Sequence, residues 1–456
     1  MRYCWRNSVT GSTAIDVRQL INQRPLGAYQ KLIVFLCFCI IALDGMDIAI
    51  MGFIAPSLKA AWGIGNAELA VVISAALIGL AVGAMISGPL ADWRGRKTII
   101  IASVFLFGLW TLLTAFSQTS QHMVIFRFLT GLGLGAAMPN VGTLVSEFAP
   151  EKKRSFIITV VFCGFSFGAA SGGFAASWMI PQWGWHSVLL MGGILPLLLV
   201  PFLLMKLPES VRFLVSKRAD SHQIHHIVDK IAPGISQADS QFAMPVAEKT
   251  PAFAVQLVLS RSYRFGSVML WGGYFFGLFM VYLLGSWLPT VIKEAGMSVT
   301  EATIITALYQ AGGTFGSLFA GWLMDRVNPH LALGMIYAAG GVATAMIGLT
   351  HAYFVMLAVV AFSSGFCLNG ANTGMNALSA RYYPTEARAT GSGWMHGVGR
   401  MGAIMSAFAG AQVVNMGWGL TTMFTILAIP ALLTSLMILA KGQFGYSRPA
   451  VAGLSY

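Results

Sequence analysis

Two carboxylates interrupt an otherwise apolar stretch near the beginning of the sequence. Asp44 and Asp47 lie within a run that extends over about residues 32–56, which is long enough to cross a bilayer. Three residues of helix turn by about 300°, so the two side chains would share one face. Ionised carboxylates must meet a cation, line a water-filled path or take up a proton when they lie inside a membrane. The pair is therefore a candidate for proton coupling, and the alternative is a structural hydrogen bond to a neighbouring helix.

Two arginines also lie within apolar runs. Arg127 is near the start of one run, whereas Arg400 is well inside another. A guanidinium inside a membrane requires a carboxylate, a carbonyl or water. Arg127 could pair with Asp44 or Asp47 and stabilise its ionised form, so that separating the pair would promote proton uptake. The alternative is an arginine that extends to the outer surface.

Arg400 is the candidate for binding an anionic substrate. A guanidinium can bind a carboxylate through two parallel hydrogen bonds, and five glycines around Arg400 leave room near the backbone. His396 lies one helical turn earlier on the same face, where it could assist binding or hydrogen-bond between helices. Trp394 is close to this face and is the aromatic contact that we include. The alternative for Arg400 is a structural pair with a carboxylate elsewhere.

Three amides are spaced three and four residues apart in a later run, at Asn369, Asn372 and Asn376. They would form one stripe on a helix. Asn372 and Asn376 could orient substrate hydroxyl groups, or all three could hydrogen-bond between helices. The histidines at 222, 225 and 226 lack the residues that would complete a coordination shell, and the five cysteines fit no metal or disulfide spacing. We expect no metal and no cofactor.

The composition places these polar residues in a membrane protein. Hydrophobic residues make up 56% of the chain and charged residues only 10%, whereas about a quarter of a soluble protein is charged. We predict an all-α membrane protein with twelve transmembrane helices. The twelve apolar runs lie at about 32–56, 69–91, 98–117, 122–146, 156–180, 187–205, 265–290, 302–324, 331–350, 352–380, 389–414 and 418–440.

Basic residues predict the orientation of these helices. Of the 28 Lys and Arg residues, 24 fall in the tails and in alternate loops, while the opposite loops hold only Lys59 and Lys293. Basic loops mark the cytoplasmic side, so both termini are expected in the cytoplasm. This placement explains the net charge of +12 without nucleic-acid binding. The polar first thirty residues lack a signal-peptide pattern, so we expect no cleaved leader.

The two halves of the sequence repeat each other. Gly131 and Gly365, like Gly168 and Gly402, are separated by 234 residues, and two further motifs recur at 233 and 234. Parallel repeats around a midplane site are typical of transporters. We expect two six-helix pseudo-repeats joined by a solvated linker helix. The predicted division is a cytoplasmic tail at 1–30, helix bundles at 31–205 and 265–441, a cytoplasmic linker at 206–264 and a cytoplasmic tail at 442–456.

Several segments resemble those of one protein family. The loop GPLADWRGRK at 88–97, RFLTGLGLGAAMPN at 127–140 and PESVRFL at 208–214 resemble signature motifs of the major facilitator superfamily. DGMD at 44–47 and GWLMDRVNPH at 321–330 narrow the resemblance to the aromatic acid:proton symporters. The resemblance covers nearly all of residues 20–440, and is strongest to 4-hydroxybenzoate and protocatechuate carriers. Trp93 departs from the pattern, because many members have Arg there.

The resemblance implies a conformational gate in the 88–97 loop. Asp92 would cap a helix or pair with a base across the cytoplasmic seam, for which Arg154 is our candidate, and Glu147 would pair with Lys152, Lys153 or Arg154. The alternative is a charge cluster that only orients the helices. The gating residues that we expect are Asp92, Gly95, Arg96, Glu147 and Arg154 in the first half, with Asp325, Arg326, His330 and Arg388 as the degenerate second set.

The resemblance also implies the function. We expect a monomeric carrier of the bacterial inner membrane that imports an aromatic carboxylate such as 4-hydroxybenzoate, protocatechuate or benzoate together with protons, by alternating access. The resemblance also links Arg127, the arginine of the fourth span, to proton coupling, and it supports Arg400 as the residue that binds the substrate. Proton cotransport avoids moving a negative charge against the membrane potential, which costs about 2.3 kcal/mol per 100 mV.

Three alternatives remain open at this point. One is a proton-antiport exporter of organic anions, and another is a carrier for a related non-aromatic acid such as muconate. The third is a membrane receptor, which is less favoured because we expect no signalling domain after residue 441. An enzyme is not expected, since no nucleophile–base pair and no set of metal ligands emerges from the sequence.

Overall fold

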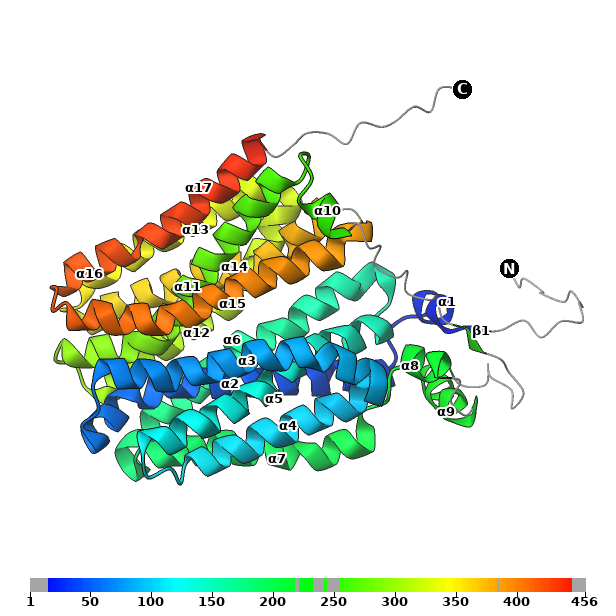
Figure 1. Ribbon diagram of the computed structural model, residues 1–456, viewed down its shortest axis with the longest axis horizontal. Coiled ribbons are helices and arrows are strands. Elements are labelled where there is room, and N and C mark those ends of the chain that lie inside the picture. Colours follow the sequence, from blue (N-terminus) through cyan, green and yellow to red (C-terminus); the bar gives the residue numbers. More distant parts are fainter. Residues whose placement is uncertain (1–14, 218–220, 233–241, 244–253, 384, 445–456) are drawn as a thin grey trace, which may run out of the picture.

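The computed structural model describes residues 15–217, 221–232, 242–243, 254–383 and 385–444. Almost all of them are helical, and the helices lie side by side along the long axis of the molecule (Figure 1). The first six long helices are α2 Ala28–Trp62, α3 Asn66–Arg94, α4 Arg96–Thr114, α5 Ser120–Phe148, α6 Arg154–Trp183 and α7 Trp185–Lys206. The second set is α11 Arg264–Glu294, α12 Val299–Arg326, α13 Pro329–Thr350, α14 Phe354–Tyr382, α15 Thr385–Asn415, and α16 Leu420–Leu427 with α17 Ile429–Phe444.

Short elements lie between and before these helices. They are β1 Ile15–Asp16, α1 Val17–Asn22, η1 Glu151–Lys153, α8 Val211–Ser216, α9 Ser221–Ile231, β2 Phe242–Ala243 and α10 Ala254–Val258. β1 and β2 form a parallel pair in which Ile15 lies opposite Phe242. The predicted linker helix corresponds to α9. The sequence did not reveal the two-residue strand pair.

Ten helices in the described part of the chain are long and apolar enough to cross a membrane, with α16 and α17 counted as one. The other two long helices, α12 and α15, are more polar but of similar length. Both lie against the opposite set of helices, α12 against α6 and α15 against α3. The result is the predicted arrangement of twelve spans. The last span is broken at Ala428, where Pro430 has no N–H to continue the helical bonding.

The repeat landmarks occupy equivalent contacts in the two sets of helices. A Cβ at Gly168 of α6 would overlap the Ala42 carbonyl oxygen of α2, and one at Gly402 of α15 would overlap the Phe275 carbonyl oxygen of α11. Glycine permits this close approach of backbones. In the same way, Gly131 lies against the Ala76 carbonyl and Gly365 against the Tyr309 carbonyl. The duplicated glycines therefore hold α2–α6, α11–α15, α3–α5 and α12–α14 together.

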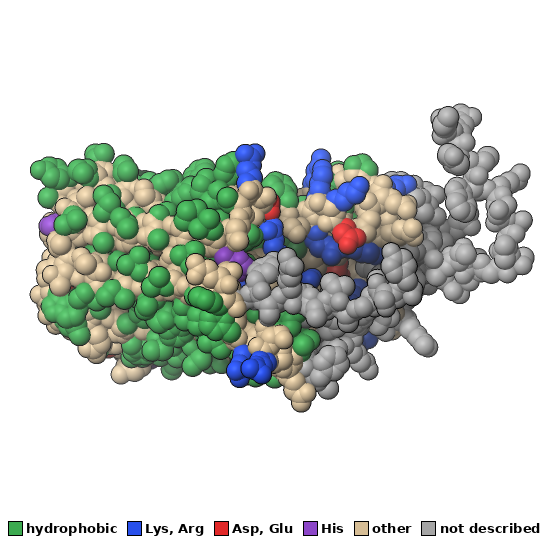
Figure 2. Space-filling model, turned by 90° about the horizontal axis from the view of Figure 1, so that it is seen from above, with side chains coloured by type: hydrophobic (Ala, Val, Ile, Leu, Met, Phe, Trp, Pro, Cys, Tyr) green, Lys and Arg blue, Asp and Glu red, His purple; other side chains and the backbone are tan. Residues whose placement is uncertain are grey.

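The two sets of helices meet along α6–α12, α3–α15 and α2–α11. Gly52 of α2 lies directly against the carbonyl oxygen of Gly285 in α11, so these backbones also touch. We call the end at which α2 begins and α17 ends the terminal end, and the opposite end the distal end. Figure 1 shows α1, α8, α9 and α10 at the terminal end. Figure 2 shows Lys and Arg side chains gathered toward that end, on a face that is otherwise mainly hydrophobic.

Candidate functional site

A buried ion pair connects α2 and α5. Nη1 of Arg127 lies 3.0 Å from Oδ2 of Asp47, and Nη2 donates to the Asp47 carbonyl oxygen at 3.3 Å. The Thr111 hydroxyl of α4 donates to the second carboxylate oxygen at 2.5 Å. Both charged side chains are almost completely excluded from solvent. Of the two partners predicted for Arg127, the structure selects Asp47, and the arginine does not extend to the surface.

Asp44 lies one turn earlier on α2 but in different surroundings. It is fully buried, and neither of its carboxylate oxygens is hydrogen-bonded to any residue that the structure describes. It interacts electrostatically with Arg400 of α15 and Tyr282 of α11. The two aspartates are separated by about 60° around the axis of α2, which is enough for them to face different neighbours. Asp47 faces its own set of helices, whereas Asp44 faces the opposite set.

Arg400 belongs to an open face of α15. It is half-buried, and His396 is exposed although it lies more than two turns inside the helix. A Cβ added at Gly393 or Gly397, on the same face, would meet no described atom within 4 Å. The open face of α15 therefore borders free space. A guanidinium on such a face can be reached by a carboxylate that enters between the two sets of helices.

The other predicted substrate residues surround Arg400. The Tyr274 hydroxyl of α11 lies 3.3 Å from Nδ1 of His396, and Tyr274 also interacts with Arg400. Trp394 stacks on Trp271 of α11, with 5.6 Å between ring centroids and 17° between planes. On α14, Asn376 is exposed and Asn372 is half-buried. Among the residues placed here, Tyr274, Tyr282 and Trp271 were not predicted, since aromatic residues are frequent in every apolar run.

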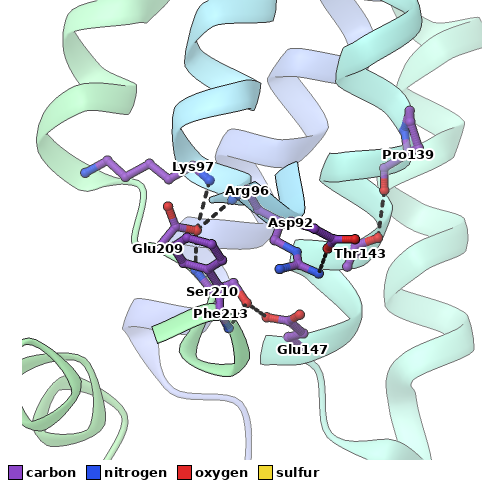
Figure 3. Close-up of polar contacts among 9 residues, drawn as sticks. All are labelled: Asp92, Arg96, Lys97, Pro139, Thr143, Glu147, Glu209, Ser210 and Phe213. Carbon is purple, nitrogen blue, oxygen red and sulfur yellow. Dashed lines mark hydrogen bonds and ion pairs between the residues drawn. The ribbon is translucent and has the colours of Figure 1, made fainter. Parts of the chain in front are cut away.

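At the terminal end, the predicted gate has different partners from those expected. Asp92 pairs with Arg96 at 3.1 Å across the turn between α3 and α4 (Figure 3). The side chain of Asp92 is 73% exposed. Gly95 forms the turn between α3 and α4 with φ +94°, a conformation that favours glycine. This conformation forms the Asp92–Arg96 pair in place of the predicted pair with Arg154, because the four-residue spacing across the tight turn brings Arg96 close to Asp92.

Glu147 also has a partner other than the predicted Lys152, Lys153 or Arg154 in this conformation. Its carboxylate accepts a hydrogen bond from the Ser210 hydroxyl, which comes from the loop before α8 (Figure 3). The neighbouring Glu209 accepts hydrogen bonds from the backbone N–H groups of Arg96 at 2.8 Å and Lys97 at 3.1 Å. The 208–214 motif therefore closes the amino end of α4 with Glu209, and Ser210 joins it to α5.

In the second predicted gating set, Asp325, Arg326 and His330 contact separate partners. Asp325 pairs with Arg381 at 2.6 Å, and the Arg326 guanidinium lies over the Trp322 ring at 4.4 Å. His330 Nε2 lies 2.9 Å from the buried Nζ of Lys441, at the end of α17. Arg388 is exposed near the start of α15. Asp325 therefore pairs across two helices, from α12 to α14, whereas Asp92 pairs with a residue only four positions along the chain.

The distal end is where polar contacts join the two sets of helices. Lys59 Nζ of α2 lies 2.6 Å from Glu294 Oε1 of α11 and 2.5 Å from Asn66 Oδ1 of α3. The Asn66 amide donates to Asn415 Oδ1 of α15 at 2.7 Å. At the terminal end, the polar side-chain contacts seen among described residues stay within one set. The sequence did not predict this distal latch, which consists of Lys59, Glu294, Asn66 and Asn415.

Comparison with known proteins agrees with this architecture. The profile of the Major Facilitator Superfamily matches residues 37–352 and 270–449. The chain is 47% identical to the 4-hydroxybenzoate transporter PcaK of Pseudomonas aeruginosa, over 95% of this chain and 97% of that protein. It is 44% identical to a gallate transporter of Pseudomonas putida (94% and 95% covered) and 33% identical to a benzoate transport protein of Acinetobacter baylyi (92% and 91%). The xylose transporter XylE of E. coli, in a partially occluded inward-open conformation, superimposes with a TM-score of 0.70 at 18% identity, covering 94% of this chain and 100% of that one.

Proposed function

This chain belongs to the Major Facilitator Superfamily, and we propose that it imports an aromatic carboxylate across the bacterial inner membrane by alternating access. Its place in this family makes it a transporter and not an enzyme. Relatives that match it along nearly their whole length are named for the transport of 4-hydroxybenzoate and gallate. These acids share a benzoate carboxylate, and that is the group that the carrier must recognise.

The observation that carries the proposal is the arrangement of Arg400 opposite Asp44. Arg400 lies on the open face of α15, and it interacts electrostatically with the buried Asp44 of α2, which belongs to the opposite set of helices. A substrate carboxylate bound by Arg400 would replace Asp44 as the counter-charge of the guanidinium. Asp44 would then be left without a cation, and it would be neutralised by a proton. Substrate and proton would thus be bound together.

The remaining polar residues support this exchange. In the Asp47–Arg127 pair, which Thr111 also hydrogen-bonds, one negative and one positive charge neutralise each other inside the first set of helices. The pair would tune proton binding at Asp44 through the shared backbone turn of α2. His396 and Trp394 would contact the substrate beside Arg400, and Asn372 and Asn376 would contact it from α14.

We infer that the terminal end faces the cytoplasm. The excess of basic residues at this end supports the orientation. With the distal latch closed, the structure would then be an inward-facing state. Asp92–Arg96 and Asp325–Arg381 would exchange partners when the terminal end closes, which is the role that we propose for the gating residues. Residues 31–205 would move as one bundle and residues 265–441 as the other. The protein would act as a monomer.

Uptake measurements test this function. Cells that express the chain should accumulate labelled 4-hydroxybenzoate, and a protonophore should abolish the accumulation. Arg400→Lys keeps the charge but loses the bidentate geometry, so uptake should fall strongly, while Lys217→Arg, at an exposed position outside the site, serves as a control. Higher retention of the acid when the gradient collapses would identify an exporter and contradict the proposal.

A further inference from the structure

Four polar atoms in the second set of helices lack partners, and they lie near one another. They are the hydroxyls of Tyr309 and Tyr337, Nδ2 of Asn369 and Oδ1 of Asn372, none of which has a hydrogen-bond partner among the described residues. Both tyrosines are completely buried. Buried polar groups are normally hydrogen-bonded, because an unsatisfied one loses its interactions with water without replacement. A cluster of four such atoms therefore indicates a site for a polar ligand group.

Several contacts show that these atoms form one cluster. A Cβ built on Gly277 of α11 would lie 2.7 Å from the Tyr337 hydroxyl and 3.2 Å from Asn372 Oδ1, so both atoms face the same point. The Tyr337 hydroxyl also interacts with those of Tyr309 and Tyr274. Asn369 lies beside the Tyr309 hydroxyl and interacts with it. The hydroxyl–amide cluster thus draws on α12, α13 and α14.

Tyr274 connects the cluster to the proposed carboxylate site. Its side chain interacts with Arg400, its hydroxyl contacts His396 at 3.3 Å, and it also interacts with Tyr337. Access is provided along α14, because Asn376 is exposed and Asn372 is half-buried. A flat acid bound at Arg400 could therefore extend past Tyr274 toward the cluster.

We propose that Tyr309, Tyr337, Asn369 and Asn372 form a subsite for a ring hydroxyl located away from the carboxylate. This inference rests on the proposed function, since Arg400 must hold the carboxylate. A phenolic hydroxyl both donates and accepts, so it can satisfy the Asn372 carbonyl oxygen and a tyrosine hydroxyl together. An unsubstituted ring would leave these atoms unpaired, and sites built for a hydroxyl discriminate against ligands that lack it. Selectivity for hydroxylated benzoates then comes from this subsite, and not from Arg400.

Binding of three acids to the purified full-length protein in nanodiscs tests the subsite. The acids are 4-hydroxybenzoate, benzoate and 2-hydroxybenzoate, whose hydroxyl lies next to its carboxylate, and each is titrated by calorimetry. Tyr337→Phe removes only the hydroxyl and should weaken 4-hydroxybenzoate binding by about tenfold. Its effect on the other two acids should be less than twofold. Asn372→Leu supplies the same comparison independently, and Tyr353→Phe, at an exposed position at the start of α14, is the matched control.

The outcomes separate the two proposals. If the variants lose the same binding affinity for all three acids, or for none of them, the hydroxyl subsite is overturned. The proposal that the chain carries an aromatic acid would still stand. A wild-type protein that binds none of the acids would overturn the proposed function and the subsite with it. Loss confined to 4-hydroxybenzoate in both variants would support the assignment.

Discussion

Arg127 and Asp47 form an ion pair from which solvent is almost completely excluded, with 3.0 Å between Nη1 and Oδ2. Removing one partner of a buried pair leaves an uncompensated charge, at a cost of about 3–5 kcal/mol. Arg127→Gln should therefore lower the thermal stability of the purified protein strongly. The double variant Arg127→Gln with Asp47→Asn should recover most of that stability, because neither charge remains. Thermal unfolding followed by size-exclusion chromatography measures both, and a double variant as unstable as the single one would contradict the pairing.

Asp44 should respond differently from Asp47 because it has no hydrogen-bond partner among the described residues. Asp44→Asn should fold with near wild-type stability. If Asp44 carries the coupled proton, the variant should lose accumulation driven by a proton gradient but retain exchange of labelled for unlabelled acid. Proteoliposomes allow both assays on the same preparation. Gradient-driven accumulation at the wild-type level would eliminate Asp44 as the proton carrier.

The distal latch should set the balance between the two states of the carrier. Lys59→Met removes a partly exposed pair with Glu294 and a bond to Asn66, contacts that contribute about 1 kcal/mol. The ratio of distally open to closed molecules should then rise about fivefold. Spin labels at Gly65→Cys and Gly419→Cys, in a background without native cysteines, report the opening by electron–electron distance measurements. At both positions a Cβ meets no described atom.

Glu68→Gln is the control for that experiment. Glu68 contacts Ser120 at the same end of the molecule, but both residues belong to the first set of helices. The fraction of molecules with the longer distance between spin labels should rise in Lys59→Met and not in Glu68→Gln. An equal rise in both variants would show that the effect is not specific to the latch.

Glu209 should stabilise the terminal end of the first set of helices. It accepts three backbone hydrogen bonds, from Arg96, Lys97 and Ser210, and its charge lies at the amino end of α4, where the helix dipole favours it. Glu209→Ala should cost about 1–3 kcal/mol of stability. Glu209→Gln keeps an acceptor and should cost less. Equal melting temperatures for the two variants would show that the hydrogen bonds do not contribute.

The sequence predicted the fold well because each span carries its own signal. Long apolar runs, interrupted by basic loops, indicate helices whatever surrounds them, and the duplicated glycines indicate that the two halves repeat each other. The break at Ala428 was not predicted, although Pro430 gives a local reason for it.

Partners of the polar residues were harder to predict, because they depend on how helices are rotated and tilted. Sequence reasoning limited Arg127 to two carboxylates, but it did not predict the partners that Asp92 and Glu147 have in this conformation. Contacts such as Lys59–Glu294 join residues that are far apart in the chain, and no local pattern marks them. The sequence gives no sign of the role of Tyr337 either, since a buried hydroxyl without a partner can be recognised only when the positions of its neighbours are known.

The contact of Gly52 with the Gly285 carbonyl has a mechanical consequence. Lys59 is seven residues beyond Gly52, whereas α2 begins twenty-four residues before it, which correspond to arms of about 10 and 36 Å at 1.5 Å per residue. Rotation about this fulcrum would displace the terminal end of α2 more than three times as far as the distal end. A small separation at Lys59 and Glu294 would then suffice to close a much wider opening at the other side of the membrane.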